Sequence, residues 1–133
     1  MREHVRQQTA ILLRRLAFQV NRGAKNGDAD SVHDLRVAIR RLSRCLRVFS
    51  SFYPGRSWKK MRKRLADLMK TAGGVRDRDI ALKLLAEAGV SRRSAIPAKL
   101  GAERRKAAHD LLLELRRWSK RGFSRKWRAR LEL

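Results

Sequence analysis

Apolar residues recur at three- and four-residue intervals along most of the chain, which is the spacing of one face of an α-helix. The pattern is clearest from Ser57 to Ala72, where the apolar positions are Trp58, Met61, Leu65, Leu68 and Ala72. No window alternates apolar and polar residues for long enough to indicate a β-strand. The pattern therefore predicts an all-α protein.

Glycine, proline and capping residues divide this pattern into helices. The predicted helices run from about Arg2 to Arg22, from Asp30 or Ser31 to Ser51, from Ser57 to Ala72, from Asp77 to Ala88 and from Pro97 to Lys120, followed by a short segment from Phe123 to Leu131. Asp30 and Ser31 are both good N-caps, and Gly73-Gly74 is expected to end the third helix as a glycine C-cap. We therefore expect an antiparallel bundle of about five helices, forming a single domain over residues 1–133 with a basic C-terminal extension at residues 122–133.

The charge of the chain points to a polyanionic partner. Lys and Arg number 35, of which 25 are Arg, against 12 Asp and Glu, so the formal net charge is +23. Such an excess destabilises a compact chain through self-repulsion, and the guanidinium fork of Arg suits phosphate oxygens. Because 43% of the residues are hydrophobic, the chain still has material for a small core.

Several other classes of protein do not fit the sequence. The single cysteine, Cys45, cannot form a disulfide within the chain, and no apolar run approaches the ~20 residues of a membrane span. Arg14 and Arg15 interrupt the N-terminal apolar stretch, which is unlike a signal peptide. The sequence has no phosphate-binding glycine loop, no cluster of metal ligands and no paired nucleophile and base. We expect a cytoplasmic protein that is not an enzyme and needs neither a cofactor nor a metal.

The second predicted helix separates a core face from a basic face. Leu35, Ile39, Leu42, Leu46 and Phe49 share an arc of about 80°. A second arc, nearly opposite, holds the stripe His33, Arg36, Arg40, Arg44 and Arg47. Like charges four residues apart destabilise a helix, and a face that is merely solvated normally mixes signs. The stripe is about 21 Å long and is therefore predicted to bind a linear chain of phosphates, with the imidazolium form of His33 as a further donor.

Two motifs resemble a known family. Residues 32–44, VHDLRVAIRRLSR, resemble the signature V-H-[DQ]-x-R-V-A-x-R-R-L-R of the CHAD domain, the conserved histidine α-helical domain. Residues 73–80, GGVRDRDI, are similar to a second family element, L-G-x-x-R-D-x-D-V, at the expected distance downstream. Together the resemblance covers most of residues 28–131.

The resemblance implies a helical bundle that binds inorganic polyphosphate, has no established catalytic chemistry and often associates with polyphosphate granules. It assigns phosphate contacts to His33, Arg36, Arg40, Arg44 and Arg76. Arg41 also matches the first motif, but it lies about 100° from the centre of the stripe and is expected to meet an acid on a neighbouring helix. Asp77 and Asp79 match the second motif and are expected to be structural, as N-caps of the fourth helix or as groups that orient an arginine.

The chain departs from the family in carrying one histidine–arginine repeat where family domains usually carry two. His109-Asp110-Leu111 echoes His33-Asp34-Leu35, but Leu112 stands where the first copy has Arg36, so the echo is read as accidental. A half-length domain leaves apolar surface that the second half would cover. The expectation is therefore either a homodimer or a chain truncated at the repeat boundary.

The remaining cations leave alternatives open. Arg62 and Lys63 on the third helix are predicted to face the same groove as the stripe. A dense C-terminal patch combines Trp118, Phe123 and Trp127 with Arg116, Arg117, Lys120, Arg121, Arg125, Lys126, Arg128 and Arg130. Its aromatic residues could stack on nucleobases, or they could be core or dimer contacts. The leading hypothesis is a polyphosphate-binding module, and the alternatives are a non-specific nucleic-acid-binding protein and an assembly module localised by its charge.

Overall fold

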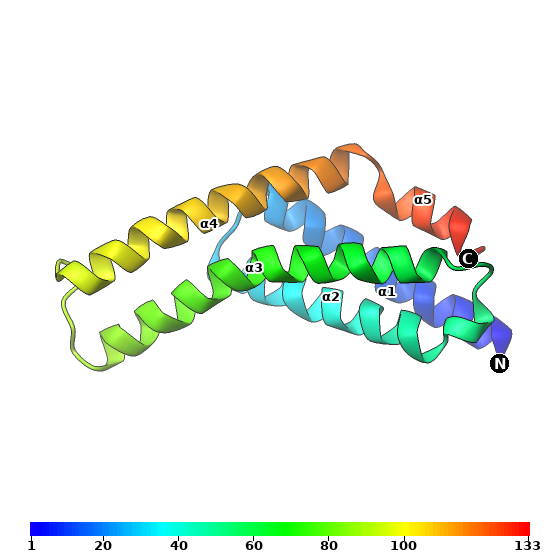
Figure 1. Ribbon diagram of the computed structural model, residues 1–133, viewed down its shortest axis with the longest axis horizontal. Coiled ribbons are helices and arrows are strands. Elements are labelled where there is room, and N and C mark those ends of the chain that lie inside the picture. Colours follow the sequence, from blue (N-terminus) through cyan, green and yellow to red (C-terminus); the bar gives the residue numbers. More distant parts are fainter.

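The computed structural model describes all 133 residues as a bundle of α-helices without strands, so the predicted all-α fold is confirmed (Figure 1). The helices are α1 (Arg2–Lys25), α2 (Ala29–Val48), α3 (Ser57–Glu87), α4 (Ala95–Lys120) and α5 (Phe123–Arg130), with a 3-10 turn, η1 (Ser50–Phe52), before α3. No helix combines the length and the apolar character needed to cross a membrane.

The core lies where α1, α2, the first half of α3 and the second half of α4 run side by side. α1 packs against α2 and α4, α3 packs against α2 and α4, and α5 folds back so that both termini lie at the same end (Figure 1). The apolar face predicted for the second helix is buried at Leu35, Ile39, Leu42 and Leu46. The bundle therefore buries the apolar face of α2, which points away from the arginines of the stripe.

A hydrogen-bonded polar pair closes one end of this core. Tyr53 follows η1 and is 6% exposed, and its hydroxyl oxygen lies 2.7 Å from the hydroxyl oxygen of Thr9 on α1. Thr9 in turn donates to the carbonyl of Val5 at 2.7 Å. Burial raises the pKa of Tyr53 above its ordinary value, since the charged phenolate would lose its hydration.

The prediction that the third helix ends at Gly73-Gly74 is wrong, because α3 continues without interruption to Glu87. Neither glycine has the positive φ of a C-cap, and the chain turns instead at Gly89, where φ is +80°. A Cβ on Gly74 would lie 3.9 Å from Ala107 of α4, so α4 packs closely against this part of α3. Asp77 and Asp79 therefore lie inside α3 and do not cap a fourth helix.

The boundary between α1 and α2 also differs from the prediction. α1 extends to Lys25, and α2 is capped by Asp28 instead of Asp30 or Ser31. The Asp28 carboxylate accepts from the backbone N–H of Ser31 at 2.8 Å, and this hydrogen bond lowers the pKa of Asp28. Ser31 itself is buried, and its hydroxyl donates to the carbonyl of Asn26 at 2.6 Å. With Asp28 as the N-cap, the hydroxyl of Ser31 is available to close the α1–α2 loop.

Residues 122–133, predicted as a basic extension, contribute to the core. Phe123, Trp127 and Leu131 are at most 4% exposed. The rings of Phe123 and Trp127 meet Trp118 of α4 edge to face, with centroids 4.9 Å and 5.5 Å from the Trp118 ring. Arg125 and Arg130 of this segment remain exposed on the surface.

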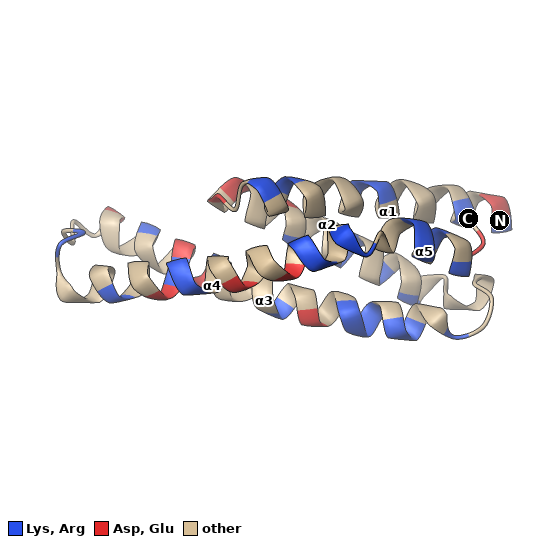
Figure 2. Ribbon diagram, turned by 90° about the horizontal axis from the view of Figure 1, so that it is seen from above, with Lys and Arg blue, Asp and Glu red and all other residues tan.

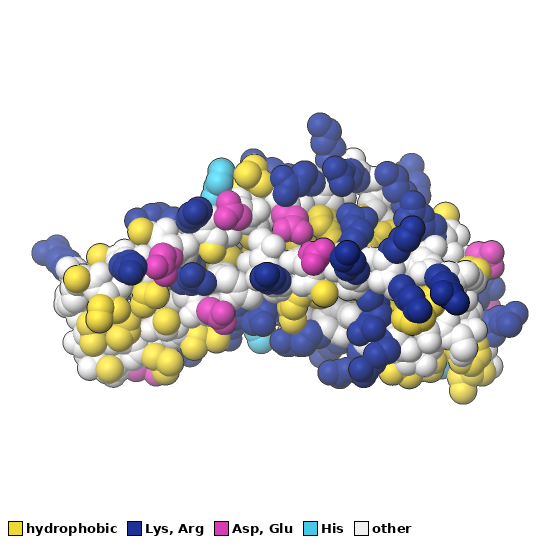
Figure 3. Space-filling view, in the orientation of Figure 1, with side chains coloured by type: hydrophobic (Ala, Val, Ile, Leu, Met, Phe, Trp, Pro, Cys, Tyr) yellow, Lys and Arg dark blue, Asp and Glu magenta, His cyan; other side chains and the backbone are white.

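Beyond the core, α3 and α4 continue as a two-helix hairpin. Between Val75 and Leu111 only Pro97 is buried, whereas Ile80, Leu84 and Ile96 are 42%, 60% and 67% exposed. Residues 77–103 carry five cations and four carboxylates, a net charge of +1 out of the +23 of the whole chain. Lys and Arg are accordingly concentrated on the other half of the molecule (Figure 2), while hydrophobic side chains gather on one side of the hairpin end (Figure 3).

Candidate functional site

A groove of about 300 Å³ lies between α2 and α3 on the basic side of α2. Ile39, Leu65, Ala66 and Met69 are its apolar or small lining residues. Its polar lining residues are Ser43 and the four arginines Arg40, Arg44, Arg47 and Arg62. Packing against α3 therefore turns the predicted stripe from a flat helix face into one wall of a groove.

The four arginines carry no compensating charge. The structure has four ion pairs, Arg6–Glu3, Arg22–Asp34, Arg78–Glu103 and Arg104–Asp79, and none of them involves a groove arginine. Arg62 is held by a hydrogen bond from its Nε to the hydroxyl of Ser43 at 3.3 Å, which links α3 to α2. Lys and Arg side chains also gather along the boundary of α3 and α2 in the space-filling view (Figure 3). The groove is thus a site of uncompensated positive charge.

Arg36 lies one helical turn before Arg40 on the same face of α2 and is partly buried. Its Nε is inaccessible to solvent and has no hydrogen-bond acceptor in the protein. A Cβ on Gly73 would lie 4.0 Å from its Nη2, so the guanidinium reaches the surface of α3. A charged donor without an acceptor is costly when buried, and an anion bound beside it would offset that cost.

The other predicted contacts lie at different distances from the groove. His33 is exposed near the start of α2, and Arg76 is partly buried one turn beyond Gly73 on α3. Arg62 lines the groove, but Lys63 does not, because it is the next residue on α3 and lies about 100° further round the helix. Ser43 and Met69 also line the groove; Ser43 shares the α2 face of Arg36 and Arg47 and could have been found from the helical wheel.

The three residues predicted to be structural have three different environments. Arg41 forms no ion pair with an acid, so the expectation that it meets one on a neighbouring helix is wrong; it lines a groove between α1 and α2. Asp77 is exposed on α3. Asp79 orients an arginine, since Arg104 of α4 donates to its carboxylate from Nε at 2.9 Å. Arg104 also donates to the carbonyl of Gly27 at 2.9 Å and thereby joins α3, α4 and the α1–α2 loop.

The C-terminal aromatic residues are unavailable for stacking on a ligand. Trp118, Phe123 and Trp127 are 4%, 4% and 1% exposed, which places them in the core. The guanidinium of Arg64 covers the Trp118 ring at 4.6 Å from its centroid. Burial lowers the pKa of Arg64, and the neighbouring charges of Arg121 and Arg130 lower it further.

Taken together, the fold and the site define a small all-α protein with an unpaired arginine groove between two antiparallel helices. The family model of the CHAD domain matches residues 9–133, and the chain belongs to this family. No curated protein and no solved structure matches the chain.

Proposed function

We propose that this CHAD domain protein binds inorganic polyphosphate in the α2–α3 groove, without catalysing a reaction. The observation that carries the proposal is the alignment of Arg40, Arg44, Arg47 and Arg62 along one groove with no carboxylate paired to any of them. Membership of a family that is associated with polyphosphate binding supports the same ligand.

The groove suits a linear polyanion better than a single phosphate. From Arg36 to Arg47 the wall of α2 extends over about 17 Å, and its arginines are spaced by three or four residues. Each guanidinium has a planar fork of donors that matches two phosphate oxygens. Successive phosphoryl groups of one chain would therefore meet successive forks, releasing counterions as they bind.

Nucleic acid is the competing polyanion. Non-specific single-strand binding usually adds stacking on exposed aromatic rings, but the three C-terminal aromatic residues are in the core. The α2 face also lacks Asn and Gln, the side chains that read base edges, between Ser31 and Ser50. These features favour a ligand that consists of phosphate alone.

A competition experiment tests the proposal. Long-chain polyphosphate should displace a labelled polyphosphate probe at physiological salt more effectively than DNA or RNA of equal total charge. The Arg40→Gln/Arg44→Gln/Arg47→Gln variant should lose at least tenfold in affinity. The matched control is Arg116→Gln/Arg117→Gln/Arg125→Gln, which removes the same charge from exposed positions outside the groove. Nucleic acid winning at equal charge, or an equal loss in both variants, would contradict the proposal.

Two further expectations accompany this function. We propose that the chain forms a homodimer, for which the hairpin of α3 and α4 offers an apolar and nearly neutral surface at Ile80, Leu84 and Ile96. Light scattering should then give twice the mass of one chain, and the Leu84→Glu variant should have the mass of a single chain.

We also propose a cytoplasmic location on polyphosphate granules, which imaging of a fluorescent fusion in cells with and without polyphosphate would test.

A further inference from the structure

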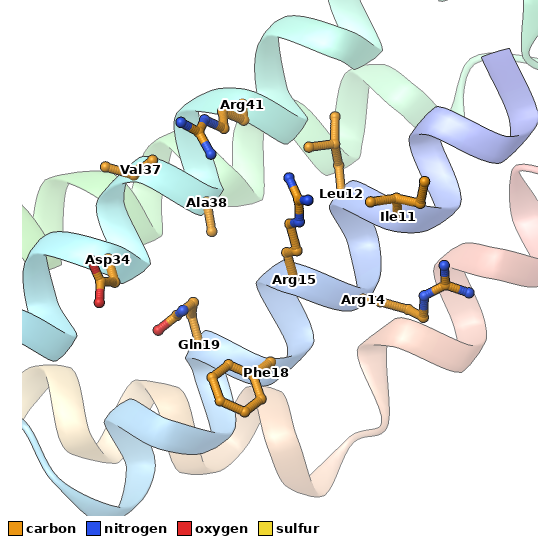
Figure 4. Close-up of a pocket in the computed structure, with 10 residues that line it drawn as sticks. All are labelled: Ile11, Leu12, Arg14, Arg15, Phe18, Gln19, Asp34, Val37, Ala38 and Arg41. Atoms are coloured by element: carbon orange, nitrogen blue, oxygen red, sulfur yellow. The ribbon is translucent and has the colours of Figure 1, made fainter. Parts of the chain in front are cut away.

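A second groove, of about 490 Å³, lies on the opposite side of α2, between α2 and α1. It shares no lining residue with the α2–α3 groove. Its volume is within the range of about 300–1,000 Å³ that is typical of small-ligand sites. Its lining residues are Ile11, Leu12, Arg14, Arg15, Phe18, Gln19, Asp34, Val37, Ala38 and Arg41 (Figure 4).

Two arginines line this groove from different helices, Arg15 from α1 and Arg41 from α2. Arg15 extends from α1 toward Arg41 on α2, whereas Arg14 points away from the space between the helices (Figure 4). Neither Arg15 nor Arg41 forms an ion pair. The one acid of the groove, Asp34, is already bound by Arg22 at 2.6 Å. The two guanidiniums therefore place two unpaired positive charges in one groove, which suits an anionic group.

The rest of the groove is apolar, which distinguishes it from the polyphosphate site. Ile11, Leu12, Val37 and Ala38 are lining residues, and Phe18 belongs to the same lining with 64% of its surface exposed. A polyphosphate chain has no apolar part and would leave these side chains in contact with water or with charge. A ligand that fills the groove needs an apolar body as well as an anionic group.

We propose that the α1–α2 groove binds a phosphate monoester that carries an apolar chain, with the phosphate between Arg15 and Arg41. A phosphate monoester has three terminal oxygens and up to two negative charges, so it can accept from two guanidinium forks that approach from different sides, whereas a carboxylate offers two oxygens and one charge. The chain lies along Ile11, Leu12 and Val37 and reaches Phe18. The proposal is independent of polyphosphate binding, because the two grooves have separate residues.

Calorimetric titration with octyl, butyl and inorganic phosphate at physiological salt tests both parts of this site. A fully buried methylene strengthens binding by about fourfold, so four methylenes in a partly open groove should make octyl phosphate at least tenfold tighter than butyl phosphate. Arg15→Gln/Arg41→Gln should weaken octyl phosphate binding at least tenfold while changing polyphosphate affinity by less than about threefold. Arg40→Gln/Arg44→Gln, which removes the same charge from the other groove, should have the reverse effect.

A second variant tests the apolar part of the site, and an experiment with vesicles shows whether the ligand is a lipid or a free ester. Val37→Asn should reduce the preference for octyl over butyl phosphate and leave inorganic phosphate binding unchanged. Vesicles of phosphatidic acid in phosphatidylcholine present the same headgroup on a membrane. Recruitment that requires Arg15 and Arg41 would identify the ligand as a lipid, and binding of monomeric octyl phosphate without recruitment would identify it as a free ester. Equal affinity for all three phosphates, or equal loss in the two arginine variants, would overturn the proposal.

Discussion

The salt dependence of polyphosphate binding is the most direct test of how many groove arginines contact the ligand. The perturbation is the replacement of Arg40, Arg44 and Arg47 by Gln, which removes three charges and keeps side chains of similar polarity. All three are exposed and form neither ion pairs nor hydrogen bonds with other side chains, so the fold should remain intact. The same measurement on Arg116→Gln/Arg117→Gln/Arg125→Gln controls for the lower net charge.

The expected magnitude follows from the number of guanidiniums along the groove. The four groove arginines, together with Arg36 one turn earlier on α2, would neutralise about five phosphates. For a single-stranded polyanion each contact contributes about −0.7 to the slope of log K against log salt concentration, which predicts a slope of about −3.5. Between 50 and 200 mM salt the wild-type affinity should then fall by about 130-fold. The triple variant keeps two contacts, with a slope of about −1.4 and a loss of about sevenfold.

Fluorescence anisotropy of a labelled polyphosphate, recorded at five or more salt concentrations, measures both slopes. The control variant should keep a slope near the wild-type value, although its affinity at low salt falls slightly because the whole molecule is less positive. A slope that is unchanged in the groove variant would refute the assignment of the contacts to α2. An equal decrease in both variants would mean that the ligand follows the total charge and recognises no particular groove.

Three further predictions concern stability, each measured by urea unfolding followed by helical circular dichroism. Gly74→Ala should stabilise the protein by about 0.5–1 kcal/mol, because the glycine lies inside α3 with room for a methyl group. Gly89→Ala should destabilise the protein by about 1–2 kcal/mol, because Gly89 has a positive φ. A destabilising Gly74→Ala together with a stabilising Gly89→Ala would show that α3 ends at the glycine pair. Arg104→Gln should lower the free energy of unfolding by about 2–3 kcal/mol, since it leaves the Asp79 carboxylate, which is 15% exposed, without its partner. The control Arg105→Gln, at the exposed neighbouring position, should lower it by less than about 0.5 kcal/mol. Tyr53→Phe should cost about 1 kcal/mol at neutral pH by removing the hydrogen bond to a buried threonine. Because burial raises the pKa of Tyr53 in the folded state, the wild type should lose stability as the pH rises above about 10, and the phenylalanine variant should lose less; identical pH profiles would contradict the assignment.

Much of the fold could be predicted from local patterns. The apolar stripes of α2 and of the first half of α3 are in the core as expected, because helical periodicity alone decides which face of a helix is apolar. The end of α3 could not be predicted this way. A glycine pair closes a helix only if one residue adopts a positive φ, and at Gly73-Gly74 the packing of α3 against α4 favours continuation instead.

The site was predictable to the extent that it depends on a single helix. Arg36, Arg40, Arg44 and Arg47 follow from the wheel of α2, and the family resemblance adds Arg76. Lys63 shows the limit of this reasoning. It is adjacent to Arg62 in the sequence, but which of two neighbouring residues turns toward α2 depends on the rotation of α3 about its own axis, which packing sets.

The sequence by itself determined that the chain is helical, strongly basic and a member of the CHAD domain family, since composition, periodicity and motif spacing are local properties. Tertiary structure decided how the charge is divided. Packing made a groove of Arg40, Arg44, Arg47 and Arg62 that no acid lines. It also paired Asp34 and Asp79 with arginines of other helices, and it placed the C-terminal tryptophans in the core. It also brought Arg15 opposite Arg41. These arrangements depend on contacts between residues far apart in the chain, and no local pattern encodes which helix faces which.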